Sequence, residues 1–212
     1  MESIIVQLAI LVMSVVIHEF SHGAIAYIMG DPTAKYMGRL TLNPLKHLDP
    51  IGSFFVPVFL FLISGGNGPI FGWAKPVPYN PHNLRNQKYG SAIVGFAGPG
   101  ANLLVALFFG LLIRFLGPYE ITLPIMTSFL NVVSIIVLIN LLLAIFNLVP
   151  IPPLDGSKIL FDFLPLSMRE IRFFLERYGF LLLIFFIFFL FQFVIPIISI
   201  LYFFITGQGF SF

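Results

Sequence analysis

Two histidines four residues apart, with a glutamate directly after the first, form the most chemically suggestive pattern in this sequence. They are His18, Glu19 and His22. On a helix, positions i and i+4 share a face, so both imidazoles can reach one metal ion. Glu19 stands where its carboxylate can act as a general base toward a water molecule on that metal. The alternative, a pair of core histidines bonded to neighbouring helices, must place three costly ionisable groups within five positions of an apolar helix.

A catalytic zinc ion needs a third protein ligand and keeps a fourth position for water. Asp155 is a candidate, because Pro150, Pro152 and Pro153 prevent a regular helix before it and Gly156 permits a tight turn after it. The spacing leaves open whether Asp155 is a ligand or the N-cap of a helix that begins near Lys158. The rival candidates for the third ligand are His47, Asp49, His82, Asp31 and Asp162.

Two asparagines lie beside helix-breaking motifs. Asn102 follows Gly98-Pro99-Gly100-Ala101, where the proline is expected to kink a helix and to free backbone carbonyls. Asn147 directly precedes the proline-rich turn. Each of them could simply be a hydrogen-bonding partner between helices, since the small residues around Pro99 permit close helix packing.

These residues must be positioned inside a membrane. The 212 residues are 58% hydrophobic and 9% charged, with a mean hydropathy of +1.01, whereas a soluble domain is about a quarter charged. The sequence predicts an all-α polytopic membrane protein with about four full transmembrane helices, since four segments exceed the ~20 residues that cross a bilayer as helix. They are Ile4–Met29, which we interpret as a retained span, Gly90–Leu116, Leu123–Val149 and Gly179–Ile205. The apolar segment Ile51–Ser64 is shorter and is expected to be re-entrant or interfacial, and the zinc site is expected between the first and third spans.

The distribution of charge predicts an orientation. If Ile51–Ser64 enters and leaves by one face, ten of the eleven Lys and Arg residues fall on a single side, which basic loops mark as cytoplasmic. A formal net charge of +2 without a dense basic run argues against nucleic acid as a partner. The chain has no Cys, which excludes disulfides and thiolate metal sites.

Three motifs in order resemble a known family. They are His18-Glu-Phe-Ser-His22, Gly98-Pro-Gly-Ala-Asn102 and Asn147-Leu-Val-Pro-Ile-Pro-Pro-Leu-Asp155-Gly156. Together they resemble the site-2 protease family of intramembrane zinc metalloproteases, peptidase family M50, and in particular its small prokaryotic subgroup without PDZ or CBS domains. The segments Arg39–Gly52 and Phe71–Val77 are also similar to that subgroup. The similarity runs from about residue 15 to residue 158, and the last span (179–205) lies outside it.

The resemblance implies a single membrane-embedded metalloprotease domain over residues 1–212, in the cell membrane of a prokaryote. It implies one Zn²⁺ per chain on His18, His22 and Asp155, a zinc-bound water activated by Glu19, and contacts of Asn147 and Asn102 with the substrate. The expected partners are the lipid bilayer and a membrane-protein substrate helix, reached from the cytoplasmic side. The alternatives are a catalytically silent membrane scaffold and a metal-binding transport protein, while the oligomeric state is left open.

Overall fold

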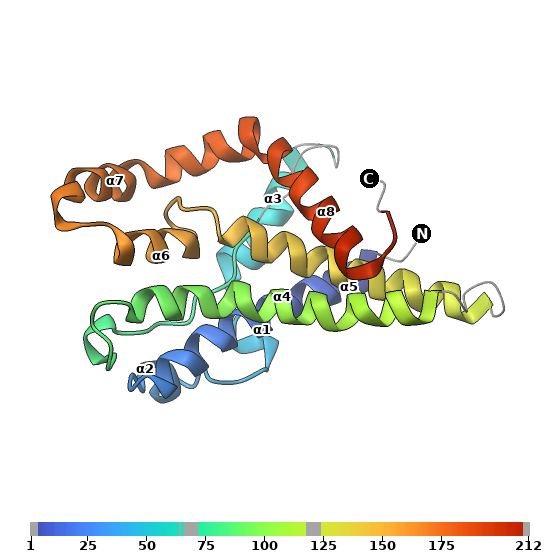
Figure 1. The fold of residues 1–212 in the computed structure, drawn as a ribbon, viewed down its shortest axis with the longest axis horizontal. Helices are drawn as coiled ribbons and strands as arrows, with labels where there is room; N and C mark the ends of the chain where they lie inside the picture. The colour runs from blue at the N-terminus through green and yellow to red at the C-terminus, as the bar shows by residue number, and fades with distance from the viewer. Residues whose placement is uncertain (1–3, 64, 66–71, 118–123, 210–212) are drawn as a thin grey trace.

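A computed structural model describes residues 4–63, 65, 72–117 and 124–209 of the chain, and within these residues it is helical without a β-strand (Figure 1). The longer helices are α1 (Ile4–Ile28), α4 (Gly90–Leu116), α5 (Pro124–Asn147), α7 (Arg169–Phe185) and α8 (Val194–Thr206). The shorter helices are α2 (Thr33–Tyr36), α3 (Val56–Ile63) and α6 (Asp155–Phe163). Short 3-10 or π turns complete the set: η1 (Pro44–Lys46), η2 (Pro50–Phe55), η3 (Pro81–Asn83), η5 (Leu166–Met168), η6 (Phe186–Leu190) and η7 (Phe191–Phe193).

The prediction of four membrane spans is confirmed. In the described part of the chain, four helices are long and apolar enough to cross a bilayer. Their bounds are Ile4–Ile28, Gly90–Leu116, Ile125–Asn147 and Arg169–Thr206. The first three match the predicted segments to within two residues at each end, apart from Leu123, which lies outside the described residues. The chain is therefore a multi-pass membrane protein.

The short apolar segment is helical from Pro50 to Ile63, and Ser64 at its predicted end lies outside the described residues. At ~1.5 Å per residue, these fourteen positions reach about 21 Å, less than the ~30 Å of a hydrocarbon core. Asp49 begins the segment by accepting hydrogen bonds from the backbone N–H groups of Ile51 and Gly52. The length agrees with a segment that does not cross the bilayer, and its re-entry stays a prediction.

The main hydrophobic core lies where α4, α5 and α8 pack against one another. Its fully buried members include Ile113, Leu141 and Ile198, one from each of the three helices. Gly110 lets α4 approach α8 closely, because a Cβ there would lie 2.3 Å from the Cγ2 atom of Ile205. The Ser134 and Tyr202 hydroxyls hydrogen-bond at 2.6 Å between α5 and α8. This core lies toward the end of the molecule at which both termini are drawn in Figure 1.

The last predicted span begins earlier than expected and is not a regular helix throughout. It covers Arg169–Thr206, with η6 and η7 between α7 and α8, and Figure 1 shows α7 and α8 meeting at an angle. A straight helix of 38 residues would be about 57 Å long, nearly twice the ~30 Å hydrocarbon core. The charged first turns therefore belong near the membrane surface, and the apolar part begins at Gly179, as the hydropathy indicates.

An extended segment, residues 72–80, crosses the first helix and is fixed at several points. The Lys75 N–H donates to the His47 carbonyl at 2.8 Å, and the Asn80 N–H donates to Asp31 Oδ2 at 2.6 Å. Asp31 is fully buried and also accepts bonds from Thr33 and Asn83. Burial by itself raises the pKa of Asp31, but these bonds outweigh it and lower the pKa below its ordinary value. The segment is thereby held against α1, where Val77 lies beside Glu19 and Gly23.

Candidate metal centre

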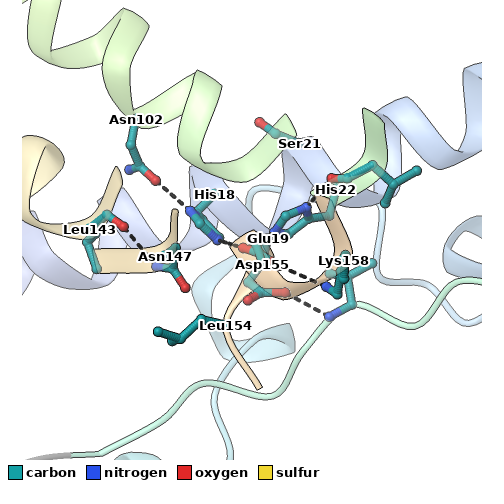
Figure 2. Close-up of polar contacts among 12 residues, drawn as sticks. His18, Glu19, Ser21, His22, Asn102, Leu143, Asn147, Leu154, Asp155 and Lys158 are labelled. Atoms are coloured by element: carbon teal, nitrogen blue, oxygen red, sulfur yellow. Dashed lines mark hydrogen bonds and ion pairs between the residues drawn. The ribbon is translucent and has the colours of Figure 1, made fainter. Parts of the chain in front are cut away.

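The structure brings His18, His22 and Asp155 together. The two histidines lie one turn apart on α1, with ring centroids 4.7 Å apart and planes at 84°. Each Nε2 atom lies 3.0 Å from Asp155 Oδ2, and all three side chains are buried (Figure 2). Within the described residues, this is the one group of three or more His, Cys, Asp or Glu side chains that could hold a metal ion. The histidines come from α1 and the aspartate from the start of α6, the short helix that follows the third span; the location of a zinc site stays a prediction.

The proline-rich turn delivers Asp155 from the end of the third span. α5 ends at Asn147, and two tight turns follow, in which Ile151 N–H donates to Val149 O and Leu154 N–H donates to Ile151 O. Gly156 permits this path, because a Cβ there would lie 2.2 Å from the Leu148 carbonyl oxygen. Asp155 is the first residue of α6, the N-cap is Leu154, and no side-chain cap bond forms. The geometry therefore contradicts the N-cap alternative for Asp155.

The hydrogen bonds of the two imidazoles determine which nitrogen carries the proton. His22 Nδ1 lies 2.6 Å from the Val94 carbonyl oxygen, and His18 Nδ1 lies 2.6 Å from Asn102 Oδ1. Both partners are acceptors, so each Nδ1 must donate, and each neutral ring then presents a lone pair at Nε2. Three electron-pair donors consequently converge: two Nε2 atoms and a carboxylate oxygen. Such a set is suited to bind a cation, and two imidazoles with one carboxylate is a ligand set of catalytic zinc.

Lys158 is a residue of the site that the sequence reasoning missed. Its Nζ atom lies 2.8 Å from Asp155 Oδ1, so Oδ2 alone faces the imidazoles. Burial by itself raises the pKa of Asp155, but its contacts with His18, His22 and Lys158 outweigh it and hold the pKa well below its usual range. The signal available in the sequence was the i,i+3 spacing of a lysine after the candidate ligand, which places both on one helix face.

Glu19 lies beside the three converging atoms in a pocket of about 130 Å³. Its Oε2 accepts a hydrogen bond of 2.8 Å from the backbone N–H of Val77, in the extended segment. The pocket is also lined by the three candidate ligands, by Lys158 and Asn147, and by residues of the two loops: Pro76, Val77, Tyr79 and Pro153. A carboxylate, an amide and an ammonium group therefore surround the open side of the candidate metal centre.

The two predicted substrate-contacting asparagines have different surroundings. Asn147 lines the pocket, and its amide donates to the Leu143 carbonyl at 2.9 Å. Asn102 is fully buried behind His18 and is not among the residues that line the pocket. The helix around Asn102 is not broken, because α4 continues through Pro99, and a kink at that proline stays a prediction. The bond from His22 to the Val94 carbonyl forms one turn before that proline.

The rival candidates for the third ligand lie elsewhere, and most have partners of their own. His47 is buried, and its Nε2 lies 2.8 Å from the Thr41 carbonyl oxygen, so this nitrogen donates. Asp162 accepts from the Ala92 N–H at 2.6 Å, and His82 is exposed in the η3 turn. Asp31 and Asp49 accept the hydrogen bonds described above. No second metal-binding group forms from these side chains in the described part of the structure.

The protein is an all-helical membrane protein, and its buried cluster of two histidines and an aspartate lies next to a glutamate. These features define the class of membrane metallohydrolases. Comparison with known proteins agrees, because the family model described as "Peptidase family M50" matches residues 124–191. The chain is 40% identical over 173 residues to "Putative zinc metalloprotease YwhC" of Bacillus subtilis (strain 168), covering 81% of this chain and 74% of that protein. The chain belongs to peptidase family M50, the site-2 protease family, and is a membrane metalloprotease.

Two further relatives are longer proteins. "Putative zinc metalloprotease Rip2" of Mycolicibacterium smegmatis is 35% identical over 145 residues, and its namesake in Mycobacterium tuberculosis (strain ATCC 25618 / H37Rv) is 32% identical over 143 residues. Each of these matches covers 68% of this chain and 51% of the relative, so the chain spans about half the length of the Rip2 proteins. No solved structure matches the chain.

Proposed function

We propose that this protein hydrolyses peptide bonds of membrane-protein substrates within or near the bilayer, with one zinc ion held by His18, His22 and Asp155. The observation that supports this proposal is the convergence of two Nε2 lone pairs and one carboxylate oxygen at 3.0 Å, beside a second carboxylate that is not part of the cluster. The names of the YwhC and Rip2 relatives support zinc as the metal. The proposal treats the chain as a single membrane-embedded domain over residues 1–212.

Glu19 is the proposed acid/base of the reaction. A bound zinc ion supplies a Lewis acid that makes a water molecule acidic and polarises the scissile carbonyl. Glu19 then accepts the proton of that water as the water attacks the carbonyl carbon, and it returns the proton to the leaving amine. The bond from Val77 N–H fixes one oxygen of Glu19 and leaves the other for proton transfer.

Two pocket residues are suited to bind the polarised carbonyl oxygen. Asn147 presents an amide to the pocket, and a donor aimed at a developing oxyanion contributes strongly to catalysis. Lys158 supplies positive charge from the opposite element, although its ammonium group is already paired with Asp155. We assign the oxyanion contact to Asn147 because its amide is bonded only within its own helix turn.

The depth of the site supports cleavage in or near the membrane. His18 lies in the 25-residue span Ile4–Ile28, about 15 Å along the helix from Ile28 at ~1.5 Å per residue. A substrate helix hides its carbonyls in internal hydrogen bonds and must unwind before it can be cut. The extended segment at residues 72–80 lies directly over Glu19, where an unwound substrate could lie alongside it.

We further propose that water reaches the site from the cytoplasmic side of the cell membrane. In Figure 1 the loop ends that carry most of the basic residues gather at the end of the molecule away from the termini, and basic loops face the cytoplasm. Cysteines introduced at Arg85 and Ser167 are expected to react only with reagents that reach the cytoplasm. Labelling of these two positions from opposite sides would contradict both this orientation and the re-entry of residues 50–63.

The two alternatives are less well supported. A metal transporter would need further ionisable groups along the other spans, but α4 carries only Arg114 and the described part of α5 carries none. The charged residues of the last span all lie in its first turns, before Gly179. A silent scaffold would have no need of Glu19 beside the cluster. The deciding experiment incubates the purified protein with a panel of single-span substrates, with zinc, with a chelator, and after zinc is restored. Zinc-dependent cleavage is the expected result, whereas stoichiometric zinc binding without cleavage of any substrate would favour the scaffold.

A further inference from the structure

A chain of buried polar side chains connects three membrane spans to His18. Ser14 lies one turn before His18 on α1, Asn102 lies on α4, and Asn140 lies on α5. Asn102 and Asn140 are 0% exposed, and Ser14 is 3% exposed. Polar groups inside a membrane protein are costly unless their hydrogen bonds are made. Three such groups in a row that ends at one imidazole therefore call for an explanation beyond packing.

The direction of each hydrogen bond in this chain follows from backbone carbonyls, which only accept. Asn140 Nδ2 donates to the Ile136 carbonyl at 2.8 Å and to Ser14 Oγ at 2.9 Å. The Asn140 amide is thereby oriented, and its Oδ1 accepts from Asn102 Nδ2 at 2.7 Å. The second hydrogen of Asn102 Nδ2 is directed to the Ser14 carbonyl at 3.2 Å. A flip of either amide would place oxygen against oxygen, so each hydrogen bond in this row of side chains has only one possible direction.

This row of hydrogen-bonded side chains ends at the Nδ1 atom of His18. Since both hydrogens of Asn102 Nδ2 are used, its Oδ1 must be the atom that faces His18 Nδ1, 2.6 Å away. His18 Nδ1 therefore donates, and Nε2 is left as a lone pair toward Asp155 Oδ2. His22 obtains the same tautomer from a backbone carbonyl, that of Val94. His18 differs in that its tautomer depends on side chains, which substitutions can change.

We infer that Asn102 and Asn140 are positioning residues, which fix His18 in the Nδ1–H tautomer so that its Nε2 atom can ligate the metal. The inference rests on the proposed zinc site. It gives Asn102 a role different from the substrate contact that the sequence suggested, because the amide has no free hydrogen to offer a substrate. Asn140 acts through Asn102, since the hydrogen bonds above link it to Asn102 and Ser14 and not to His18.

The variants Asn102→Leu and Asn140→Leu remove the hydrogen bonds that fix the tautomer of His18. Asn131→Leu is the matched control variant. Asn131 lies on α5 like Asn140 but is exposed, so its loss should leave the site unchanged. Loss of a partner that orients a metal-ligating histidine typically weakens metal affinity by about 10–100-fold. We expect a zinc dissociation constant raised by about 10-fold or more in both site variants, with a fall in kcat and little change in KM.

A second measurement tests the tautomer without zinc or substrate. In zinc-free protein with ¹⁵N-labelled histidine, the ring nitrogen shifts of His18, assigned with a His18→Gln variant, distinguish Nδ1–H from Nε2–H. We expect Nδ1–H in the wild type and in Asn131→Leu, and a shift toward Nε2–H in Asn102→Leu.

An Nε2–H tautomer in the zinc-free wild type would overturn the inference even if a leucine variant failed to fold. So would folded site variants with unchanged zinc affinity, or an equal loss in Asn131→Leu. The zinc affinities and the ring nitrogen shifts do not require proteolysis, so failure of the proposed function would be seen separately, as wild-type protein that does not cleave.

Discussion

Gly98 lies where α4 passes directly over the two candidate zinc-binding imidazoles, and Gly98→Ala tests how closely the helix and the site are fitted. A Cβ at this position would lie 2.5 Å from His22 Nε2, 2.6 Å from His18 Nε2 and 2.7 Å from His18 Cε1. Ordinary van der Waals contact begins at 3.4 Å, so either α4 or the imidazoles must move by about 0.9 Å. The methyl group contacts the two nitrogen atoms that are proposed to bind the metal.

The expected effect on activity is much larger than the effect on stability. Overpacking in a well-packed region costs about 1–3 kcal/mol, but replacement of a helical glycine by alanine returns about 1 kcal/mol of helix propensity. The net loss of unfolding free energy is therefore about 0–2 kcal/mol. A displacement of about 1 Å at a catalytic site can cost about 100-fold in rate. We expect Gly98→Ala to lower kcat/KM by about 100-fold and to weaken zinc binding, with a melting temperature lowered by no more than about 8 °C.

Gly100→Ala is the matched control on the same helix. A Cβ there would meet the Phe96 ring at 3.1 Å, and Phe96 is half exposed and can move aside. This variant should keep zinc affinity and peptidase activity close to those of the wild type. The assays are chelator competition for zinc and cleavage of a single-span substrate in detergent or liposomes. A Gly98→Ala protein with zinc affinity and activity within threefold of wild type would refute the close approach of α4 to the imidazoles.

Three substitutions test the roles assigned to individual charged groups. Glu19→Gln should abolish proteolysis while zinc stays bound, because the amide is nearly isosteric and Glu19 is not part of the metal-binding cluster; loss of zinc on metal analysis would make Glu19 a ligand instead. Asp155→Asn should lose both zinc and activity, since the amide is a poor zinc ligand, and an active, folded variant would remove Asp155 from the site. Lys158→Met frees the second oxygen of Asp155, which Lys158 holds at 2.8 Å, and should lower kcat by about 10-fold or more, the scale expected when a group that orients a metal ligand is lost. Lys158→Arg should restore much of that loss, and equal defects in the two variants would show that the charge at this position does not act through Asp155.

The sequence by itself determined the membrane spans and the pairing of the two histidines. Both are local properties: a span is a run of apolar residues of sufficient length, and residues i and i+4 of a helix share a face whatever surrounds them. The early start of the last span was missed for the same reason. Arg169, Arg172 and Arg177 lower the apparent hydropathy of turns that are nevertheless helical.

Only the tertiary structure decided which distant residues meet the histidines. Asp155 lies 137 residues from His18 in the chain, and its roles as ligand and as N-cap could not be distinguished by spacing. The turn after α5, the close fit of Gly156 and the pairing with Lys158 aim its carboxylate at α1. The sequence suggested a substrate contact for Asn102 and gave no signal for Asn140, because a sequence does not show which helix faces pack together. The hydrogen bonds of a buried amide depend on that packing, and here the packing directs the Asn102 amide to His18 and the Asn140 amide to Asn102.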